Sequence, residues 1–73
     1  MDTAPICSDP EVHSGTPVFA GTRVPVRNLF DYLQAGDSLD EFLQDFPSVS
    51  KATAIATLEL ARTVVLQYAH PAR

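Results

Sequence analysis

The segment from Gly15 to Val26 constrains the fold more than any other part of the chain. It reads Gly-Thr-Pro-Val-Phe-Ala-Gly-Thr-Arg-Val-Pro-Val, so two glycines and two prolines bracket two short β-prone runs. Glycine supplies the positive φ of tight turns, and proline favours an edge or an element boundary over a sheet interior. We therefore expect a compact β-arm that leads directly into a first helix. Its motif residues are Gly15, Pro17, Gly21, Thr22, Arg23 and Pro25.

Arg23 carries the only charge of this segment. Its planar guanidinium suits a carboxylate or a cluster of carbonyl oxygens. Two roles are open for it: a structural clamp onto Asp9 or Glu11, which we favour, or a group that contacts a ligand. In the first case Arg23→Ala destabilises the arm.

Two short amphipathic helices follow the arm. The first is predicted from Pro25 or Val26 to Ala35, with Gly36 just past its end. The second starts at Ser38, which forms an S-x-x-E capping box with Glu41, and stops before Pro47. Both carry one apolar stripe at helical spacing, so we expect them to pack stripe to stripe. The stripes are Val26, Leu29, Phe30 and Leu33, and then Leu39, Phe42, Leu43 and Phe46.

The third helix is predicted to be the longest, from an N-cap at Ser50 to about Tyr68. Its best stripe should face the first two helices and consists of Ala54, Leu58, Ala61, Val65 and Tyr68. Further apolar residues lie on other sides, and so small a domain cannot cover every side of a helix. They form a candidate face for a partner protein or a second copy: Ile55, Leu60, Val64 and Leu66.

The length of 73 residues allows one domain. Within it we expect a flexible terminus over 1–5, the β-arm over 6–25, a three-helix body over 26–69 and a tail over 70–73. Ile6-Cys7 and Val12-His13 are candidate short strands. The predicted fold class is mainly α: a three-helix, helix-turn-helix bundle with a short N-terminal β-arm.

Composition narrows the classes of function. Apolar residues make up 45% of the chain and charged residues 19%, which is apolar-rich for a small domain and favours a homodimer. The net charge of −4 disfavours a general affinity for phosphate backbones. A single cysteine, Cys7, fits a reducing compartment. The absence of a secretory signal and of an apolar run of membrane-spanning length leads us to expect a cytoplasmic protein that does not enter the membrane.

Catalytic chemistry is not indicated. Cys7, His13 and His70 have no spacing that favours a nucleophile–base pair or a metal site, and the glycines lack the context of a nucleotide-binding loop. We therefore expect a protein that is not an enzyme and that binds no cofactor or metal.

The second and third helices, joined by a short turn, suggest a helix-turn-helix unit. Asp40, Glu41 and Asp45 on the second helix oppose an approach to DNA. DNA binding is therefore expected to be weak. The candidate contacts are Arg27, Lys51, Thr53 and Thr57.

The chain resembles the domain-of-unknown-function 433 family over about residues 6–62. The matching residues are Asp9-Pro10, Gly15, Pro17-Val18, Gly21-Thr22-Arg23-Val24-Pro25-Val26, Gly36, Ser38, Glu41, Phe46-Pro47 and Val49-Ser50. Lys51-Ala52 stands where the family usually has an acidic pair. The resemblance implies a homeodomain-like three-helix fold and an antitoxin that binds and inhibits a PIN-like ribonuclease toxin.

Two hypotheses of function follow. The first is the antitoxin of a type II toxin–antitoxin pair, which acts by protein–protein occlusion. The second is a DNA-binding regulator that uses the second and third helices, and an antitoxin that represses its own operon would combine both. A basic rim drawn from Arg23, Arg27, Lys51 and Arg62 would favour DNA, whereas a continuous apolar groove along the third helix would favour a protein partner.

Overall fold

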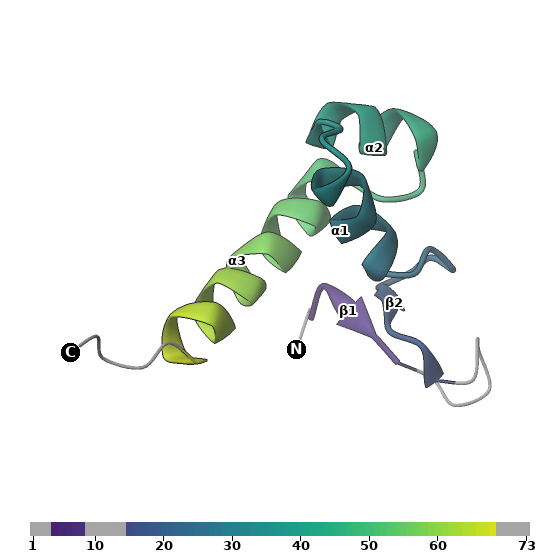
Figure 1. Ribbon diagram of the computed structural model, residues 1–73. Coiled ribbons are helices and arrows are strands. Elements are labelled where there is room, and N and C mark those ends of the chain that lie inside the picture. The colour runs from purple at the N-terminus through teal and green to yellow at the C-terminus, as the bar shows by residue number, and fades with distance from the viewer. Residues whose placement is uncertain (1–3, 9–14, 69–73) are drawn as a thin grey trace.

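The computed structural model describes residues 4–8 and 15–68. Its elements follow in the order β1 (Ile6–Cys7), β2 (Val18–Phe19), α1 (Arg27–Gln34), α2 (Leu39–Asp45) and α3 (Lys51–Tyr68). Figure 1 shows a mainly helical chain with a small two-stranded sheet near its N-terminal end. The predicted helical body and β-arm are therefore confirmed. The predicted strand Val12-His13 lies outside the described residues.

Backbone hydrogen bonds on both sides of β2 hold the arm together. β1 pairs antiparallel with β2, so that Ile6 lies opposite Phe19. On the other side of β2, the Phe19 N–H donates to the Val24 carbonyl at 3.0 Å, and Val18 forms an isolated bridge to Pro25. The β-prone run Arg23-Val24 thus returns along β2 without forming a strand of its own. Gly15 and Gly21 have φ values of 85° and 77°, which explains why glycine stands at both bends.

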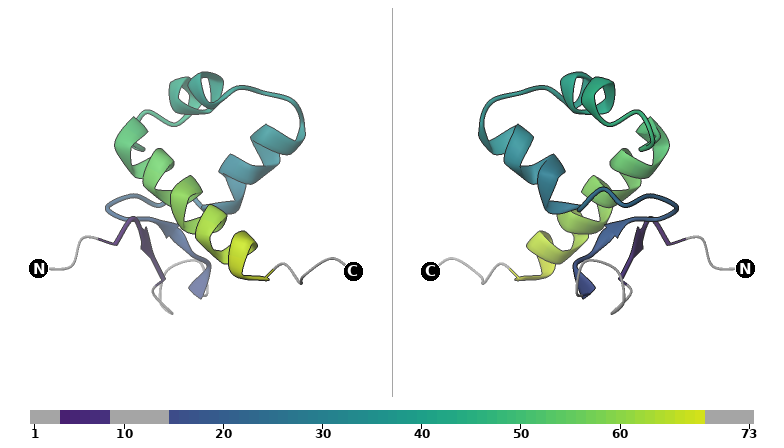
Figure 2. Two further views of the ribbon diagram at one scale, coloured as in Figure 1. Left: turned by 90° about the vertical axis from the view of Figure 1, so that its left-hand side faces the viewer. Right: turned by 90° about the vertical axis from the view of Figure 1, so that its right-hand side faces the viewer.

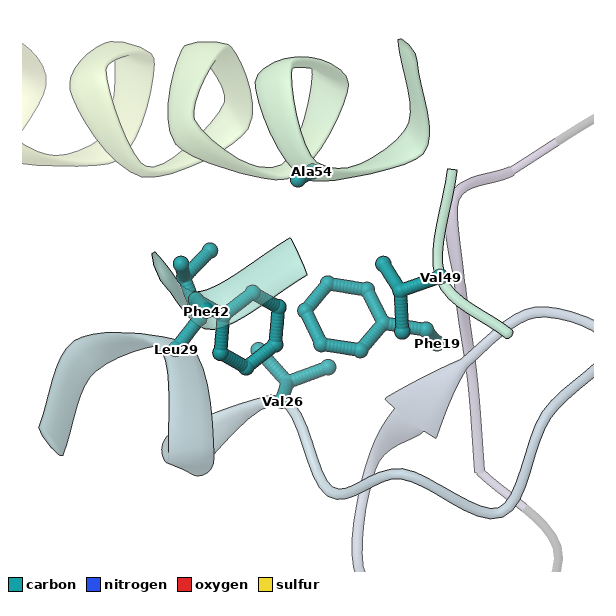
Figure 3. Close-up of a cluster of buried hydrophobic side chains, with 6 residues drawn as sticks. All are labelled: Phe19, Val26, Leu29, Phe42, Val49 and Ala54. Carbon is teal, nitrogen blue, oxygen red and sulfur yellow. The ribbon is translucent and has the colours of Figure 1, made fainter. Parts of the chain in front are cut away.

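The hydrophobic core joins the arm to all three helices. Figure 3 shows the aromatic rings of Phe19 from β2 and Phe42 from α2 beneath Ala54 of α3. The two rings have centroids 5.9 Å apart, and neither side chain is exposed to solvent. Each buried aromatic side chain of this size contributes about 1.5–3 kcal/mol. The other buried hydrophobic members of this cluster are Val26, Leu29 and Val49.

Both predicted helix starts on the second and third helices are confirmed. Ser38 Oγ accepts the Glu41 N–H at 3.1 Å, and Glu41 Oε1 accepts the Ser38 N–H at 2.8 Å. Ser50 Oγ accepts the Thr53 N–H at 3.1 Å at the start of α3. Gly36 has a φ of 93° just after α1, as a residue that ends a helix should.

Most of α3 extends beyond the core. Only Ala54 and Thr57 in its first two turns are buried. Figures 1 and 2 show its C-terminal half running away from α1 and α2. The prediction that Val65 and Tyr68 face the first two helices is wrong, because these side chains are 62% and 79% exposed. The physical reason is length: at about 1.5 Å per residue, helices of 8 and 7 residues cannot cover one of 18 residues.

Candidate functional site

Thr22 holds the tip of the arm. Its Oγ1 donates to the Phe19 carbonyl at 2.9 Å and accepts the Val24 N–H at 3.0 Å. The Thr22 N–H also donates to the Phe19 carbonyl at 3.0 Å. The sequence had suggested Arg23 as the residue that stabilises the arm, and the role of Thr22 was not predicted. The available signal was a threonine directly after a turn glycine, since a threonine hydroxyl can bond the backbone two residues on.

Arg23 lies exposed beside this turn. It makes no hydrogen bond or ion pair with any residue that the structure describes. The predicted bridge to backbone carbonyls is therefore not formed within that part of the chain. The alternative clamp partners, Asp9 and Glu11, lie outside the described residues.

A hollow of about 610 Å³ separates the arm from the first turns of α3. We call it the arm hollow. All its lining side chains are small, so its floor is set by backbone and Cβ atoms. The lining residues are Ala4, Pro5, Ala20, Gly21, Ala52, Thr53 and Ala56. The hollow thus places the arm motif next to the N-terminal half of α3.

The predicted partner face on α3 is exposed but divides into two faces. Leu60 and Val64 are one helical turn apart, and their side chains are 47% and 58% exposed. Ile55 and Leu66 lie on a different side, with exposures of 42% and 59%. We call the first side the Leu60 face and the second the Leu66 face. The Leu66 face also carries the charged residues of α3, Lys51, Glu59 and Arg62, whereas the Leu60 face carries none.

The predicted DNA contacts differ in their exposure to solvent. Arg27 on α1 and Lys51 at the start of α3 are exposed, and Thr53 is half-buried. Thr57 is only 2% exposed, and its Oγ1 donates to the Thr53 carbonyl at 3.0 Å. The choice of Thr57 as a DNA contact is therefore wrong. The hydroxyl is satisfied inside its own helix, so the side chain can be buried in the core.

A second, acidic hollow of about 280 Å³ lies between α1 and α2. The Tyr32 hydroxyl donates to Asp45 Oδ2 at 2.6 Å. That hydrogen bond, partial desolvation and the charges of Asp45, Asp37 and Glu41 raise the pKa of Tyr32 above its ordinary value of 10.0. Within the described ranges, no group of histidine, cysteine or carboxylate side chains could hold a metal ion. The negative potential here opposes contact between α2 and a phosphate backbone.

These features define a small, mainly helical domain with a β-arm and two exposed apolar faces on its longest helix. The sequence profile of the family described as "Protein of unknown function (DUF433)" matches residues 6–61. The chain belongs to this family, as its motif residues indicated. The match covers the arm, α1, α2 and the first part of α3, and it ends before Val64 and Leu66.

The chain is also similar to part of a longer protein. The chain is 41% identical over 44 residues to "Uncharacterized protein y4eO" of Sinorhizobium fredii (strain NBRC 101917 / NGR234). The match covers 60% of this chain and 20% of that protein, so the chain spans only a fifth of the relative's length. No solved structure matches the chain. Among the described residues, no helix is both long enough and apolar enough to cross a membrane.

Proposed function

We propose that this protein is the antitoxin of a type II toxin–antitoxin pair, a non-catalytic protein that binds and occludes a PIN-like ribonuclease toxin in the cytoplasm. The observation that carries the proposal is the exposure of apolar side chains on the C-terminal half of α3. Leu66 is 59% exposed there, and Ile55 on the same side of α3 is 42% exposed, although both could be buried against a partner.

The free end of α3 is suited to binding in a groove. A helix that projects from its own core and is apolar on more than one side can insert into an apolar cleft of another protein. Val65, about 100° around the helix from Leu66 and on the stripe of Ala54 and Leu58, is also 62% exposed. Transfer of one such half-exposed side chain from water contributes about 1 kcal/mol, so several together supply a useful part of a binding free energy. We assign the toxin contact to the Leu66 face.

Arg23 can add specificity to the same complex. Its side chain is exposed near the tip of the arm and makes no bond with a described residue. A planar guanidinium pairs well with a carboxylate of a partner. The resemblance to the antitoxin-like family supports a protein partner of this kind.

The test is inhibition of a PIN-like nuclease, and a PIN-like reading frame beside this protein's gene is the expected candidate. The two proteins are purified separately, and cleavage of a fluorescent RNA is measured while the full chain is titrated in. We expect loss of cleavage at equimolar protein. Leu66→Glu should weaken inhibition, whereas Gln44→Glu, which adds the same charge on the exposed surface of α2, should not. Undiminished cleavage in the presence of excess wild-type protein would refute the proposal.

A DNA-binding regulator is the second candidate. The order of α2, a short turn over residues 46–50 and α3 supports this candidate, because a helix-turn-helix unit needs two helices joined by a short turn. Lys51 is exposed at the start of α3. The net charge of −4 and the exposed Asp40 and Asp45 weigh against it. We therefore place operator binding second, as an activity of the protein together with a partner.

A further inference from the structure

The Leu60 face changes in size along the length of α3. Positions 52, 53, 56, 60, 63, 64 and 67 lie within an arc of about 120°, at about 100° per residue, and so share one side of the helix. In the N-terminal half the side chains are small: Ala52, Thr53 and Ala56 border the arm hollow. In the C-terminal half, Leu60 and Val64 project with 47% and 58% exposure. The same face of the helix thus has a recess, formed by Ala52, Thr53 and Ala56, and a ridge, formed by Leu60 and Val64.

The chemistry of this face suits burial against another apolar surface. All seven positions are uncharged. The two threonine hydroxyls already have partners within or next to the helix: Thr53 Oγ1 accepts from Ser50 Oγ at 2.9 Å, and Thr63 Oγ1 donates to the Glu59 carbonyl at 3.1 Å. Covering them therefore leaves few polar groups without a hydrogen bond, which is the usual cost of burying a polar surface.

We propose that a second copy of this chain covers the Leu60 face, with the two α3 helices antiparallel about a two-fold axis near residue 58. In that arrangement Leu60 of each copy lies opposite Ala56 of the other. Val64 then lies opposite Ala52, at the mouth of the arm hollow. The ridge of each chain fills the recess of its partner, which is the self-complementarity that a two-fold interface requires.

The contact area favours this arrangement over a contact between the two C-terminal halves alone. A stable interface buries about 800 Å² per partner, roughly one seventh of the 5511 Å² surface of this chain. The projecting half of α3 is only about 15 Å long, whereas the whole 18-residue helix is about 27 Å long. Antiparallel pairing uses the full helix and adds the arm residues Pro5, Ala20 and Gly21. It also leaves the Leu66 face open.

This inference does not rest on the proposed antitoxin activity, because its test needs no toxin. Sedimentation velocity of the full chain at tens of micromolar should show a dimer. Val64→Glu should raise the dissociation constant more than about a hundredfold, since the symmetry places the charge twice in one apolar interface. Leu66→Glu is the matched control, because Leu66 is 59% exposed and Val64 58%. Its dissociation constant should stay within about threefold of the wild-type value.

Exchanging the large and small side chains at positions 56 and 60 tests the register of the two α3 helices. Ala56→Leu should fill the recess and weaken the dimer, and Leu60→Ala should remove the ridge and weaken it too. The double variant Ala56→Leu/Leu60→Ala should regain most of the affinity, because it moves the large side chain to the opposing position. Far-ultraviolet circular dichroism checks that each variant is folded. A monomeric wild type, equal dissociation by Val64→Glu and Leu66→Glu, or a double variant as weak as the sum of its single changes would overturn the proposal.

Discussion

Replacing Thr22 with valine removes two hydrogen bonds from the arm while keeping the shape of the side chain. The hydroxyl donates to the Phe19 carbonyl and accepts from the Val24 N–H, and both bonds are partly buried. Each such bond contributes about 0.5–1.5 kcal/mol, so Thr22→Val should destabilise the protein by about 1–3 kcal/mol. A chain of 73 residues has a total stability of about 4–11 kcal/mol. The predicted loss is therefore a substantial fraction of the total free energy of unfolding.

The assay is thermal and urea unfolding followed by circular dichroism. A change of 1 kcal/mol moves the melting temperature of a domain of this size by about 4–8 °C, so we expect a decrease of roughly 5–20 °C. Thr22→Ser keeps the hydroxyl and should unfold within about 0.5 kcal/mol of the wild type. The comparison must be made at one protein concentration, because a dimer would make the melting temperature depend on it.

Arg23→Ala is the second comparison. Because Arg23 is exposed and has no bond to a described residue, its removal should change the stability by no more than about 0.5 kcal/mol. The sequence alone indicated the opposite, with Arg23 as the stabilising residue of the arm. If Thr22→Val melts with the wild type while Arg23→Ala melts early, the assignment of the arm's stability to Thr22 is wrong.

Three further predictions concern the helices and their charges. Ser38→Ala should cost about 1 kcal/mol because it removes the capping box of α2, whereas Ser48→Ala in the following turn should cost almost nothing; urea unfolding compares the two. The pKa of Tyr32 is raised in the folded state, so the hydrogen bond to Asp45 stabilises the fold below pH 10. This stabilisation is lost as the pH rises through the higher pKa of the folded state. Tyr32→Phe should therefore flatten the alkaline limb of a curve of stability against pH. The free protein should bind DNA weakly, with an affinity that falls steeply with salt in fluorescence anisotropy; tight, sequence-specific binding at physiological salt would favour the regulator instead.

Local signals in the sequence predicted the helices well. The start of α2 followed from Ser38 and Glu41 because a capping box satisfies backbone N–H groups that are present wherever a helix begins. The apolar stripes of α1 and α2 predicted the core for a similar reason, since each stripe needs only one neighbour. Such features depend on residues three or four positions apart and so can be recognised without the fold.

The errors concern residues whose surroundings depend on distant parts of the chain. Val65 continues the same stripe as Ala54, but nothing in the helical pattern says where the neighbouring helices end. Thr57 looks polar in the sequence, yet a bond to Thr53 within the helix allows its burial. The arm hollow was missed altogether, because it is made by small side chains from three separated segments.

The residues of the projecting end of α3 can change without loss of the buried core. The match to the family profile ends at residue 61, and residues 62–68 contribute nothing to the buried core. Most substitutions at exposed positions change the stability by less than about 0.5 kcal/mol. If the proposed partner contacts the last two turns of this helix, substitutions there can change binding while the arm and the core keep their stability.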